Sequence, residues 1–238
     1  MNIFFGVFAY YCVHVCDCVS EYADINVSLL LPRNGSYLFS VSKITPAIHI
    51  GIRNGYHKYL PKYGATMNVT YADSKCKESI CMNEAIKLYA NHRPQLFIGP
   101  TCDLAVAPVA RQATFWNIPV ISVRALARDF RINKKRSYHL LTRLGPANLN
   151  TLSHFLGHLF RLVGFQKVKI LYSRDETKGV FDLFCHYVTE SIVHDIQEQS
   201  SDITILHYRM KDPINATLIL KNQISLAFGG KFIYVKLS

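Results

Sequence analysis

The stretch that decides the fold is Leu96-Phe97-Ile98-Gly99-Pro100-Thr101-Cys102, followed by a helical segment and by Asn117-Ile118-Pro119-Val120-Ile121-Ser122. The apolar residues before Gly-Pro predict a short buried strand that ends in a turn. Asp103 is positioned to cap the next helix and Trp116 to close it. The apolar residues between them keep helical spacing: Ala105, Val106, Val109, Ala110, Ala113 and Phe115. The stretch therefore predicts one β-α-β unit with parallel, buried strands.

The turn from Gly99 to Cys102 is the first candidate binding site. In the predicted unit it lies at the carboxyl end of a strand and the amino end of a helix, where open α/β sheets collect ligands.

The rest of the chain repeats the alternation of strand and helix. Further strands are expected over 25–31, 66–71, 138–142, 168–172, 203–208 and 232–235. Further helices are expected from Pro46 to Leu60 and over 80–89, 148–162, 181–194 and 215–228. In the helix over 80–89 the expected buried side carries Ala85, Ile86, Leu88 and Tyr89. This order predicts an α/β fold with parallel sheets and right-handed crossovers.

Composition narrows the class of protein. A chain of 238 residues, half of them hydrophobic, has enough apolar side chains for one large or two small domains, and disorder is not expected. The formal net charge is +11. No run of 18 apolar residues occurs, so the sequence encodes no transmembrane helix.

The first twenty residues have two interpretations. Ile3 to Val15 is mostly apolar, and Cys18-Val19-Ser20 offers small residues for cleavage, which indicates a signal peptide over 1–20. The absence of Lys and Arg before the apolar run leaves a buried amino-terminal strand as the alternative. The signal peptide is preferred, because residues 25–31 already supply a better first strand.

Four Asn-x-Ser/Thr sequons point towards the secretory pathway. They place candidate glycosylation sites at Asn26, Asn34, Asn68 and Asn215. Behind a candidate signal peptide, this pattern favours an extracellular protein.

Several blocks of the chain resemble the extracellular ligand-binding region of natriuretic peptide receptors and other receptor guanylyl cyclases. The blocks are Ile98–Cys102, Ala107–Arg111, Trp116–Val120, Thr142–Pro146 and Ile170–Tyr172. Their order and spacing together make the resemblance specific, and it extends from about Ile25 to Val235.

The resemblance implies a two-lobed fold of the type I periplasmic-binding-protein class. Lobe one is expected over 21–145 and a partial lobe two over 146–238, with the boundary near Pro146. The returning strands, transmembrane helix, kinase-like domain and cyclase domain of the family are not in this sequence. We therefore expect a fragment, a truncated gene model or a shortened secreted form, attached to a membrane only through segments missing here.

The resemblance also implies roles for the cysteines. Cys76 and Cys102 match the conserved first disulfide loop, which leaves Cys81 as a buried free thiol. The cysteine that matches Cys185 pairs in the family with one expected at or next to Lys236. We therefore expect Val235 to be the last residue that matches the receptors. Cys102 has a competing interpretation as an activated thiolate at a helix amino terminus, which would suit a cytosolic enzyme.

Ligand positions follow from the same resemblance. The turn containing Thr101 and Cys102 matches a chloride-binding turn, and helix amino termini suit anions on physical grounds. Peptide-contacting positions fall on Arg111, Tyr172, His186, Tyr187, His207 and Arg209. Arg209 stands where the mammalian receptors have an acidic contact, which favours a ligand with acidic groups.

Two other patterns were weighed against simpler explanations. His154 and His158 have a zinc-binding spacing on a predicted helix, but no third ligand is near, so a polar stripe is preferred and no metal is expected. The basic stretch Arg124, Arg128, Arg131, Lys134, Lys135 and Arg136 could hold a nucleic-acid phosphate backbone. A solvated loop, or a face for an acidic peptide, is preferred, and no nucleic-acid partner is expected.

The sequence thus predicts an extracellular peptide-hormone receptor module, with no catalytic residues and no cofactor other than chloride. The full-length family acts as a homodimer coupled to guanylyl cyclase. The alternative is a secreted binder of a small molecule or peptide, such as a decoy or a periplasmic-type protein. A cytosolic α/β enzyme that uses Cys102 is the distant third.

Overall fold

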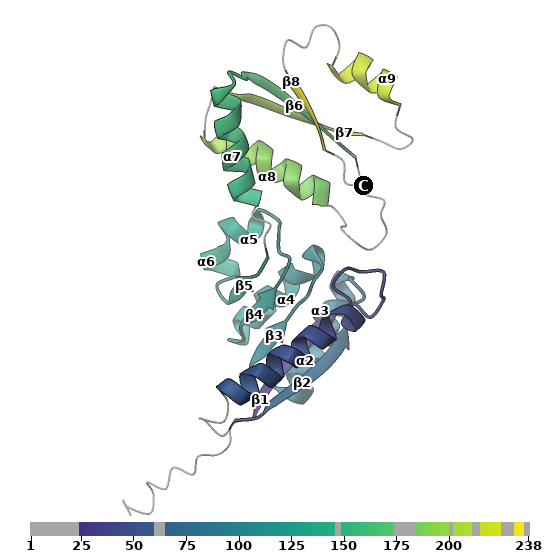
Figure 1. The fold of residues 1–238 in the computed structure, drawn as a ribbon, viewed down its shortest axis with the longest axis vertical. Coiled ribbons are helices and arrows are strands. Elements are labelled where there is room, and N and C mark those ends of the chain that lie inside the picture. Colours follow the sequence, from purple (N-terminus) through teal and green to yellow (C-terminus); the bar gives the residue numbers. More distant parts are fainter. Residues whose placement is uncertain are drawn as a thin grey trace, which may run out of the picture.

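The computed structural model describes residues 24–59, 65–145, 149–173, 184–199, 202–210, 215–224 and 231–235. The expected signal peptide and Lys236 lie outside these ranges. Figure 1 shows two α/β lobes along the long axis of the molecule. The short helices α5 (Asp129–Ile132) and α6 (Lys134–Ser137) lie between them. No helix in the described ranges has both the length and the apolarity needed to cross a bilayer.

The first lobe is a parallel sheet of five strands in the order β2-β1-β3-β4-β5. The strands are β1 (Ile25–Leu31), β2 (Met67–Asp73), β3 (Leu96–Ile98), β4 (Val120–Ser122) and β5 (Leu141–Arg143). Phe97 pairs in register with Val120, which in turn pairs with Leu141. The β-α-β unit predicted from residues 96–122 is therefore confirmed, because the strands before and after its helix pair in parallel.

Helices cover both faces of this sheet. They are α2 (Val41–Lys58), α3 (Glu78–His92) and α4 (Asp103–Phe115). Leu30 packs with Phe97 and the inner sides of α3 and α4, whereas Leu29 and Leu31 lie in a second cluster with α2. Because side chains alternate along a strand, β1 contributes apolar side chains to the cores on both faces of the sheet.

The second lobe is a parallel sheet of three described strands in the order β7-β6-β8. Its elements are α7 (Leu149–Leu162), β6 (Lys167–Ser173), α8 (Phe184–Gln199), β7 (Thr204–Met210), α9 (Ala216–Ile219), a π-helical turn over Leu220–Ile224, and β8 (Lys231–Val235). Val168 and Ile170 face α7 and α8, and Leu171 faces α9. The chain passes between the sheets after β5, but Pro146 is not described, so the exact lobe boundary stays a prediction.

Several local predictions were wrong. Pro46 does not start its helix: α2 begins at Val41, with the backbone N–H of Val41 bonded to the Pro32 carbonyl, and Pro46 lies inside it. Asp103 is not a cap, because the cap residue is Cys102 and the Asp103 carboxylate is used elsewhere. Residues 138–140 precede β5 rather than belonging to it, and the 215–228 helix is only α9 plus the π-helical turn in the described part.

Three aromatic or aliphatic side chains expected on helix interiors are exposed. They are Ile86, Tyr89 and Phe115, the last with 83% of its surface exposed. Tyr89 stacks on Trp116, the residue that caps α4, with ring centroids 4.2 Å apart. The helical spacing of apolar residues predicted the right helices, but it predicted more buried residues on each helix than the structure has.

Among the described glycines of the first lobe, Gly99 leaves the least room for a side chain. Its φ is +92°, and a Cβ placed there would lie 2.3 Å from the carbonyl oxygen of Leu30 in the neighbouring strand β1. Only glycine fits both the conformation and the space. The turn at the carboxyl end of β3 therefore depends on this residue.

We predict that Gly99→Ala lowers the free energy of unfolding by at least about 2 kcal/mol, because the new methyl group meets backbone that cannot move aside. Gly51→Ala in α2 is the matched control, since a Cβ at Gly51 meets nothing within 4 Å. That variant should gain up to about 1 kcal/mol from helix propensity. Chemical denaturation followed by circular dichroism measures both, and similar values for the two variants would contradict the prediction.

Candidate functional site

A buried ion pair anchors the segment that leaves the first sheet. The Asp103 carboxylate at the start of α4 accepts bonds from the Arg124 guanidinium at 2.7 Å and 2.6 Å, and from the Leu126 backbone N–H at 2.7 Å. Both charged side chains are almost fully buried. An aspartate at a helix start looks like a cap in sequence, but here it fixes the connection between the lobes to α4.

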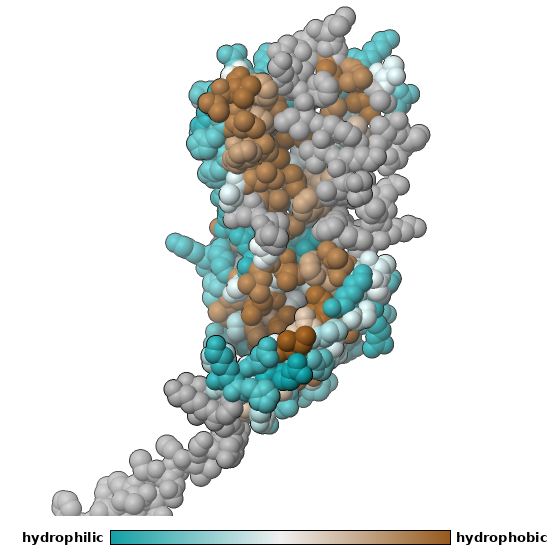
Figure 2. All heavy atoms as spheres, in the orientation of Figure 1, coloured by the Kyte–Doolittle hydropathy of each residue, from teal (hydrophilic) through white to brown (hydrophobic). Residues whose placement is uncertain are grey.

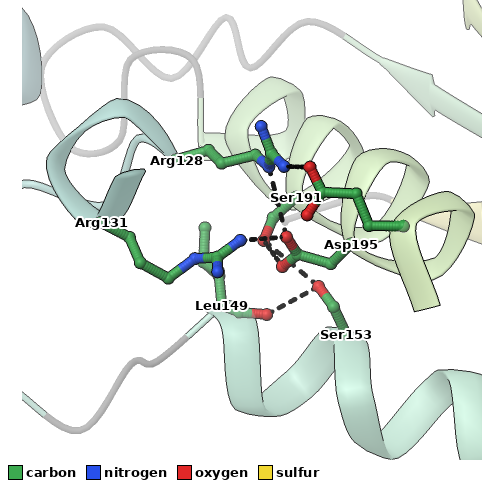
Figure 3. A network of polar contacts seen from close by, with 7 residues as sticks. Arg128, Arg131, Leu149, Ser153, Ser191 and Asp195 are labelled. Atoms are coloured by element: carbon green, nitrogen blue, oxygen red, sulfur yellow. Dashed lines mark hydrogen bonds and ion pairs between the residues drawn. The ribbon is translucent and has the colours of Figure 1, made fainter. Parts of the chain in front are cut away.

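The same connection reaches the second lobe through two further arginines. Figure 3 shows Arg128 and Arg131 converging on Asp195 of α8, with the Arg128 Nε atom 3.3 Å from the carboxylate. Arg128 also pairs with Glu198, one turn further along α8. Asp195 is only 2% exposed, so its charge depends on these partners.

A chain of hydroxyl groups extends this network into α7. The Ser191 hydroxyl donates to Asp195 at 3.0 Å and lies 3.2 Å from the Ser153 hydroxyl, which donates to the Leu149 carbonyl at 2.8 Å. Ala127 of the connection packs against the cores of both lobes. We call this arrangement of Arg128, Arg131 and Asp195 the inter-lobe joint.

The joint corrects the expectation of a solvated basic loop. Arg124, Arg128 and Arg131 are bound to carboxylates of the protein itself. Lys134 donates to backbone carbonyls, including that of Tyr138 at 3.0 Å, and burial lowers its pKa. Most of the basic stretch is thus occupied internally and is not presented to an acidic peptide or to phosphates.

Five of the six predicted peptide-contacting residues lie near the carboxyl end of β6. Tyr172 has its ring centroid 6.2 Å from that of His186 and 6.3 Å from that of His207, and His186 lies 5.9 Å from Tyr187. Arg209 is the register partner of Tyr172 on β7. Strands β6 and β7 and the start of α8 thereby place one aromatic and basic cluster on the second lobe.

Burial divides this cluster into two kinds of residue. Tyr172 and Tyr187 are buried, whereas His186, His207 and Arg209 are exposed. Burial, with a further contribution from the negative charge of Asp103, raises the pKa of Tyr187 to about 12. The two tyrosines form the floor of the cluster, and the two histidines and the arginine form its accessible surface.

Arg111 lies in a different cluster, within the first lobe. Its guanidinium donates to the Tyr138 hydroxyl at 2.9 Å and 2.7 Å, and that hydroxyl donates to Asp129 at 2.6 Å. The hydrogen bond from Tyr138 outweighs burial and holds the pKa of Asp129 below its usual range. Sequence reasoning missed Tyr138 and Asp129, because no local pattern joins residues that lie 18 to 27 positions from Arg111.

The turn after β3 carries a disulfide and an unpaired hydroxyl. Cys76 and Cys102 are joined, with their Cα atoms 5.4 Å apart, which removes the thiol that the enzyme interpretation requires. The Thr101 side-chain oxygen is buried and has no hydrogen-bond partner in the described part of the chain. Such a hydroxyl beside a helix amino terminus fits an anion at this turn.

Most of the remaining predicted sites lie on the surface. Asn34, Asn68 and Asn215 are exposed, but Asn26 is half-buried within β1 and is bonded to Asn68, so it is the least accessible sequon. His154 and His158 are exposed on α7. In the described ranges no group of three potential metal ligands occurs. Cys185 is buried in α8.

Two cavities lie apart from the joint, between α2 and the first sheet. One of about 510 Å³ is lined by residues including His49, Arg53 and Tyr56, and an apolar one of about 360 Å³ by residues including Val27, Ile48 and Leu96. Neither touches the second lobe, so neither corresponds to a small-molecule site between lobes.

Comparison with known proteins identifies the family. The model of the receptor family ligand binding region matches residues 52–210. This chain belongs to that family. Rat atrial natriuretic peptide receptor 3 is 34% identical over 181 residues, and the human receptor of the same name is 30% identical over 204 residues. Rat atrial natriuretic peptide receptor 2 is 29% identical over 125 residues.

The similarity covers most of this chain and a minor part of each relative. The two receptor 3 matches cover 74% and 83% of this chain but only 33% and 37% of the rat and human receptors. The receptor 2 match covers 52% of this chain and 12% of that receptor. The chain therefore spans about a third of the length of the receptor 3 proteins that it matches.

Solved structures confirm the fold class. A periplasmic binding protein from Burkholderia mallei superposes with a TM-score of 0.60 at 14% identity, covering 85% of this chain and 51% of that one. A solute-binding protein of an ABC transporter from R. palustris, in complex with 4-hydroxybenzoate, gives a TM-score of 0.56 at 14% identity, covering 90% and 54%. The type I periplasmic-binding-protein fold predicted from the sequence is thus confirmed.

We predict that Asp195→Ala lowers the free energy of unfolding by about 3 kcal/mol, because it leaves two arginines beside a buried site without their carboxylate. Glu198→Ala removes a pair in which the acid is 61% exposed, and it should cost less than about 1 kcal/mol. Urea denaturation followed by circular dichroism compares them. Equal, small losses would show that the joint contributes little to stability.

We also predict that Cys81 is inert to thiol reagents in the folded protein. Burial, with a smaller contribution from Glu84, raises the pKa of this thiol from 9.0 to about 12. A chromogenic disulfide reagent at about pH 8 should therefore react with it only after unfolding.

The same shift has a consequence for stability. In the unfolded chain the thiol ionises from about pH 9, while in the folded chain it stays protonated up to about pH 12, so stability should fall as the pH rises between these values. Cys81→Ala should weaken this dependence between about pH 9 and about pH 12. An identical pH dependence in the variant and the wild type would contradict the assignment.

Proposed function

We propose that this chain is the ligand-binding module of an extracellular peptide-hormone receptor of the natriuretic type. The observation that carries the proposal is the similarity to receptors named for atrial natriuretic peptide, over 74–83% of the chain. The proposed activity is binding rather than catalysis. In a full-length receptor of this type, binding would be coupled to guanylyl cyclase signalling and the receptor would act as a homodimer.

The hormone would contact the exposed surface of the second-lobe cluster. His186, His207 and Arg209 are accessible there, and they stand on buried Tyr172 and Tyr187. This surface offers hydrogen-bond donors and one fixed positive charge, which suits a peptide with acidic groups. Arg111 would contribute from the first lobe after exchanging its bond to Tyr138 for one to the ligand.

Chloride is proposed as a bound ion at the turn of Thr101 and Cys102. Support comes from the buried, unpartnered Thr101 hydroxyl and from the position of the turn at the start of α4. The nearby Asp103 charge is neutralised by Arg124, so it does not repel an anion at the turn.

Direct binding measurements test the proposal. We predict that atrial natriuretic peptide, or an analogue enriched in Asp and Glu, binds the secreted chain, and that Arg209→Glu weakens binding at least about tenfold by reversing the charge that faces the acidic groups. His207→Ala should weaken it less. Surface plasmon resonance in chloride buffer, repeated with chloride replaced by gluconate, gives the affinities and the role of the ion.

Matched controls separate contact from folding. Arg53→Glu reverses an exposed charge on α2 of the first lobe and should leave the affinity unchanged. Tyr172→Phe is preferred to Tyr172→Ala, because Tyr172 is buried and its removal would disturb the core. Binding of 4-hydroxybenzoate but of no peptide would overturn the proposal in favour of a small-molecule binder.

A further inference from the structure

The short helix α5 is attached to both lobes. Arg128 and Arg131 bind Asp195 of α8 in the second lobe, as Figure 3 shows. Asp129, which lies between these two arginines in the sequence, accepts a hydrogen bond from the Tyr138 hydroxyl of the first lobe at 2.6 Å. Because the inter-lobe joint holds α5 in place, it also fixes the position of the Asp129 carboxylate.

The Tyr138 hydroxyl places Arg111 of α4 beside the same carboxylate. The Arg111 Nε and Nη2 atoms both donate to this hydroxyl, at 2.9 Å and 2.7 Å, so its acceptor sites are used. Tyr138 is fully buried, and its ring centroid lies 4.8 Å from that of Phe130, so packing fixes its position. The Arg111 Nη2 atom is consequently held 3.8 Å from the Asp129 Oδ2 atom.

Arg111 and Asp129 form an incomplete ion pair. Their separation is too long for a hydrogen bond, and their side chains are 57% and 47% exposed. The other N–H groups of Arg111 have no partner among the residues that the structure describes. An exposed pair of this kind is weak, whereas a carboxylate that accepts two hydrogen bonds from one guanidinium is a strong partner. An incoming acidic group could therefore replace the present partners of Arg111.

Asp129 is a single negative charge in positive surroundings. It is the only acidic residue in the sequence from Arg124 to Arg143, where seven residues are Lys or Arg. Lys135 and Arg136 of α6 are exposed, and Figure 2 shows hydrophilic side chains projecting beside α5 and α6. These positive charges favour the approach of an acidic group to this part of the surface, and Asp129 opposes it.

Asp129 differs from the buried carboxylates that bind the same stretch. Asp103 and Asp195 are almost inaccessible and contact arginines directly. Asp129 is half exposed, and the Tyr138 hydroxyl lies between it and Arg111. The hydrogen bond from Tyr138 holds the pKa of Asp129 below its usual range, so the carboxylate keeps its charge at neutral pH. Of these three carboxylates, Asp129 is the one that a ligand from solution can displace.

We propose that Asp129 is an internal competitor for the acidic group of a ligand at Arg111, and that Tyr138 positions the guanidinium for this exchange. The ligand carboxylate would accept two hydrogen bonds from Arg111 and replace both the Tyr138 hydroxyl and the Asp129 charge. Asp129 would thus set the affinity of the first-lobe contact. This inference rests on the proposed function only in taking Arg111 as a contact for an acidic ligand.

A double-mutant cycle on Arg111 and Asp129 tests the proposal, with hexaglutamate as the acidic probe and isothermal titration calorimetry as the measurement. Asp129→Asn should raise the affinity of the chain for the probe about fivefold, because Arg111 loses its resident negative charge. The same substitution in an Arg111→Ala background should change the affinity by less than about twofold. Asp129→Glu keeps the charge and should stay close to the wild type.

The matched control for net charge is Asp24→Asn, which removes an exposed carboxylate at the other end of the first sheet, before β1. It should leave the affinity for hexaglutamate nearly unchanged. Equal gains from Asp24→Asn and Asp129→Asn would overturn the proposal, because net charge alone would explain them. An equal gain from Asp129→Asn with and without Arg111, or no binding of the probe to any variant, would also overturn it.

A second ligand separates this inference from the proposed function. Suppose that atrial natriuretic peptide binds, and that Asp129→Asn changes the affinity of neither this peptide nor hexaglutamate. The competitor role would then be wrong and the receptor function would stand. A gain for hexaglutamate that depends on Arg111, in a chain that binds no natriuretic peptide, would support the competitor role and contradict the proposed hormone.

Discussion

A carboxylate that is nearly inaccessible to water must be paired, and in this protein the pairing of Asp195 joins the two lobes. Arg128 and Arg131 come from the connection that leaves the first sheet, and Asp195 comes from α8. Because α8 also carries His186 and Tyr187, the joint sets where the second-lobe cluster lies relative to the first lobe. The position of the proposed hormone surface is thus governed by an ion pair that does not belong to it.

The first lobe connects to this joint through a second buried ion pair. Asp103 binds Arg124 and the backbone of Leu126, so the start of α4, the disulfide at Cys102 and the connection are held together. A displacement of one lobe would act on the turn after β3 through these bonds. The candidate anion site is therefore tied to the connection that carries Arg128 and Arg131 of the inter-lobe joint.

The alternation of strands and helices could be predicted because the length and spacing of each apolar run indicate its secondary structure without knowledge of the rest of the fold. Residues 96–98 and 120–122 form strands where the sequence places them, and the parallel pairing follows from the helix between them. The cluster of Tyr172, His186, Tyr187 and His207 was reached through the family resemblance. The partners of charged residues could not be predicted, because Asp103 and Arg124, or Arg128 and Asp195, meet only after folding. For the same reason the basic stretch that forms the joint was expected to be a solvated loop. Pro46 was expected to start a helix, but α2 begins at Val41, where a backbone bond to Pro32 forms only in the folded chain.

Because the inter-lobe joint is buried, dissolved salt should affect the charges of this protein unequally. Mobile ions screen charges that water surrounds, and they have little influence on charges that the protein has enclosed. Asp195 is enclosed, whereas Arg209 stands at the surface. A rise in ionic strength would therefore reduce the long-range attraction of the proposed acidic ligand to the second lobe, while the two lobes stayed in the same arrangement. If the chain has the proposed receptor function, added salt would slow its association with ligand before it changed the arrangement of the lobes.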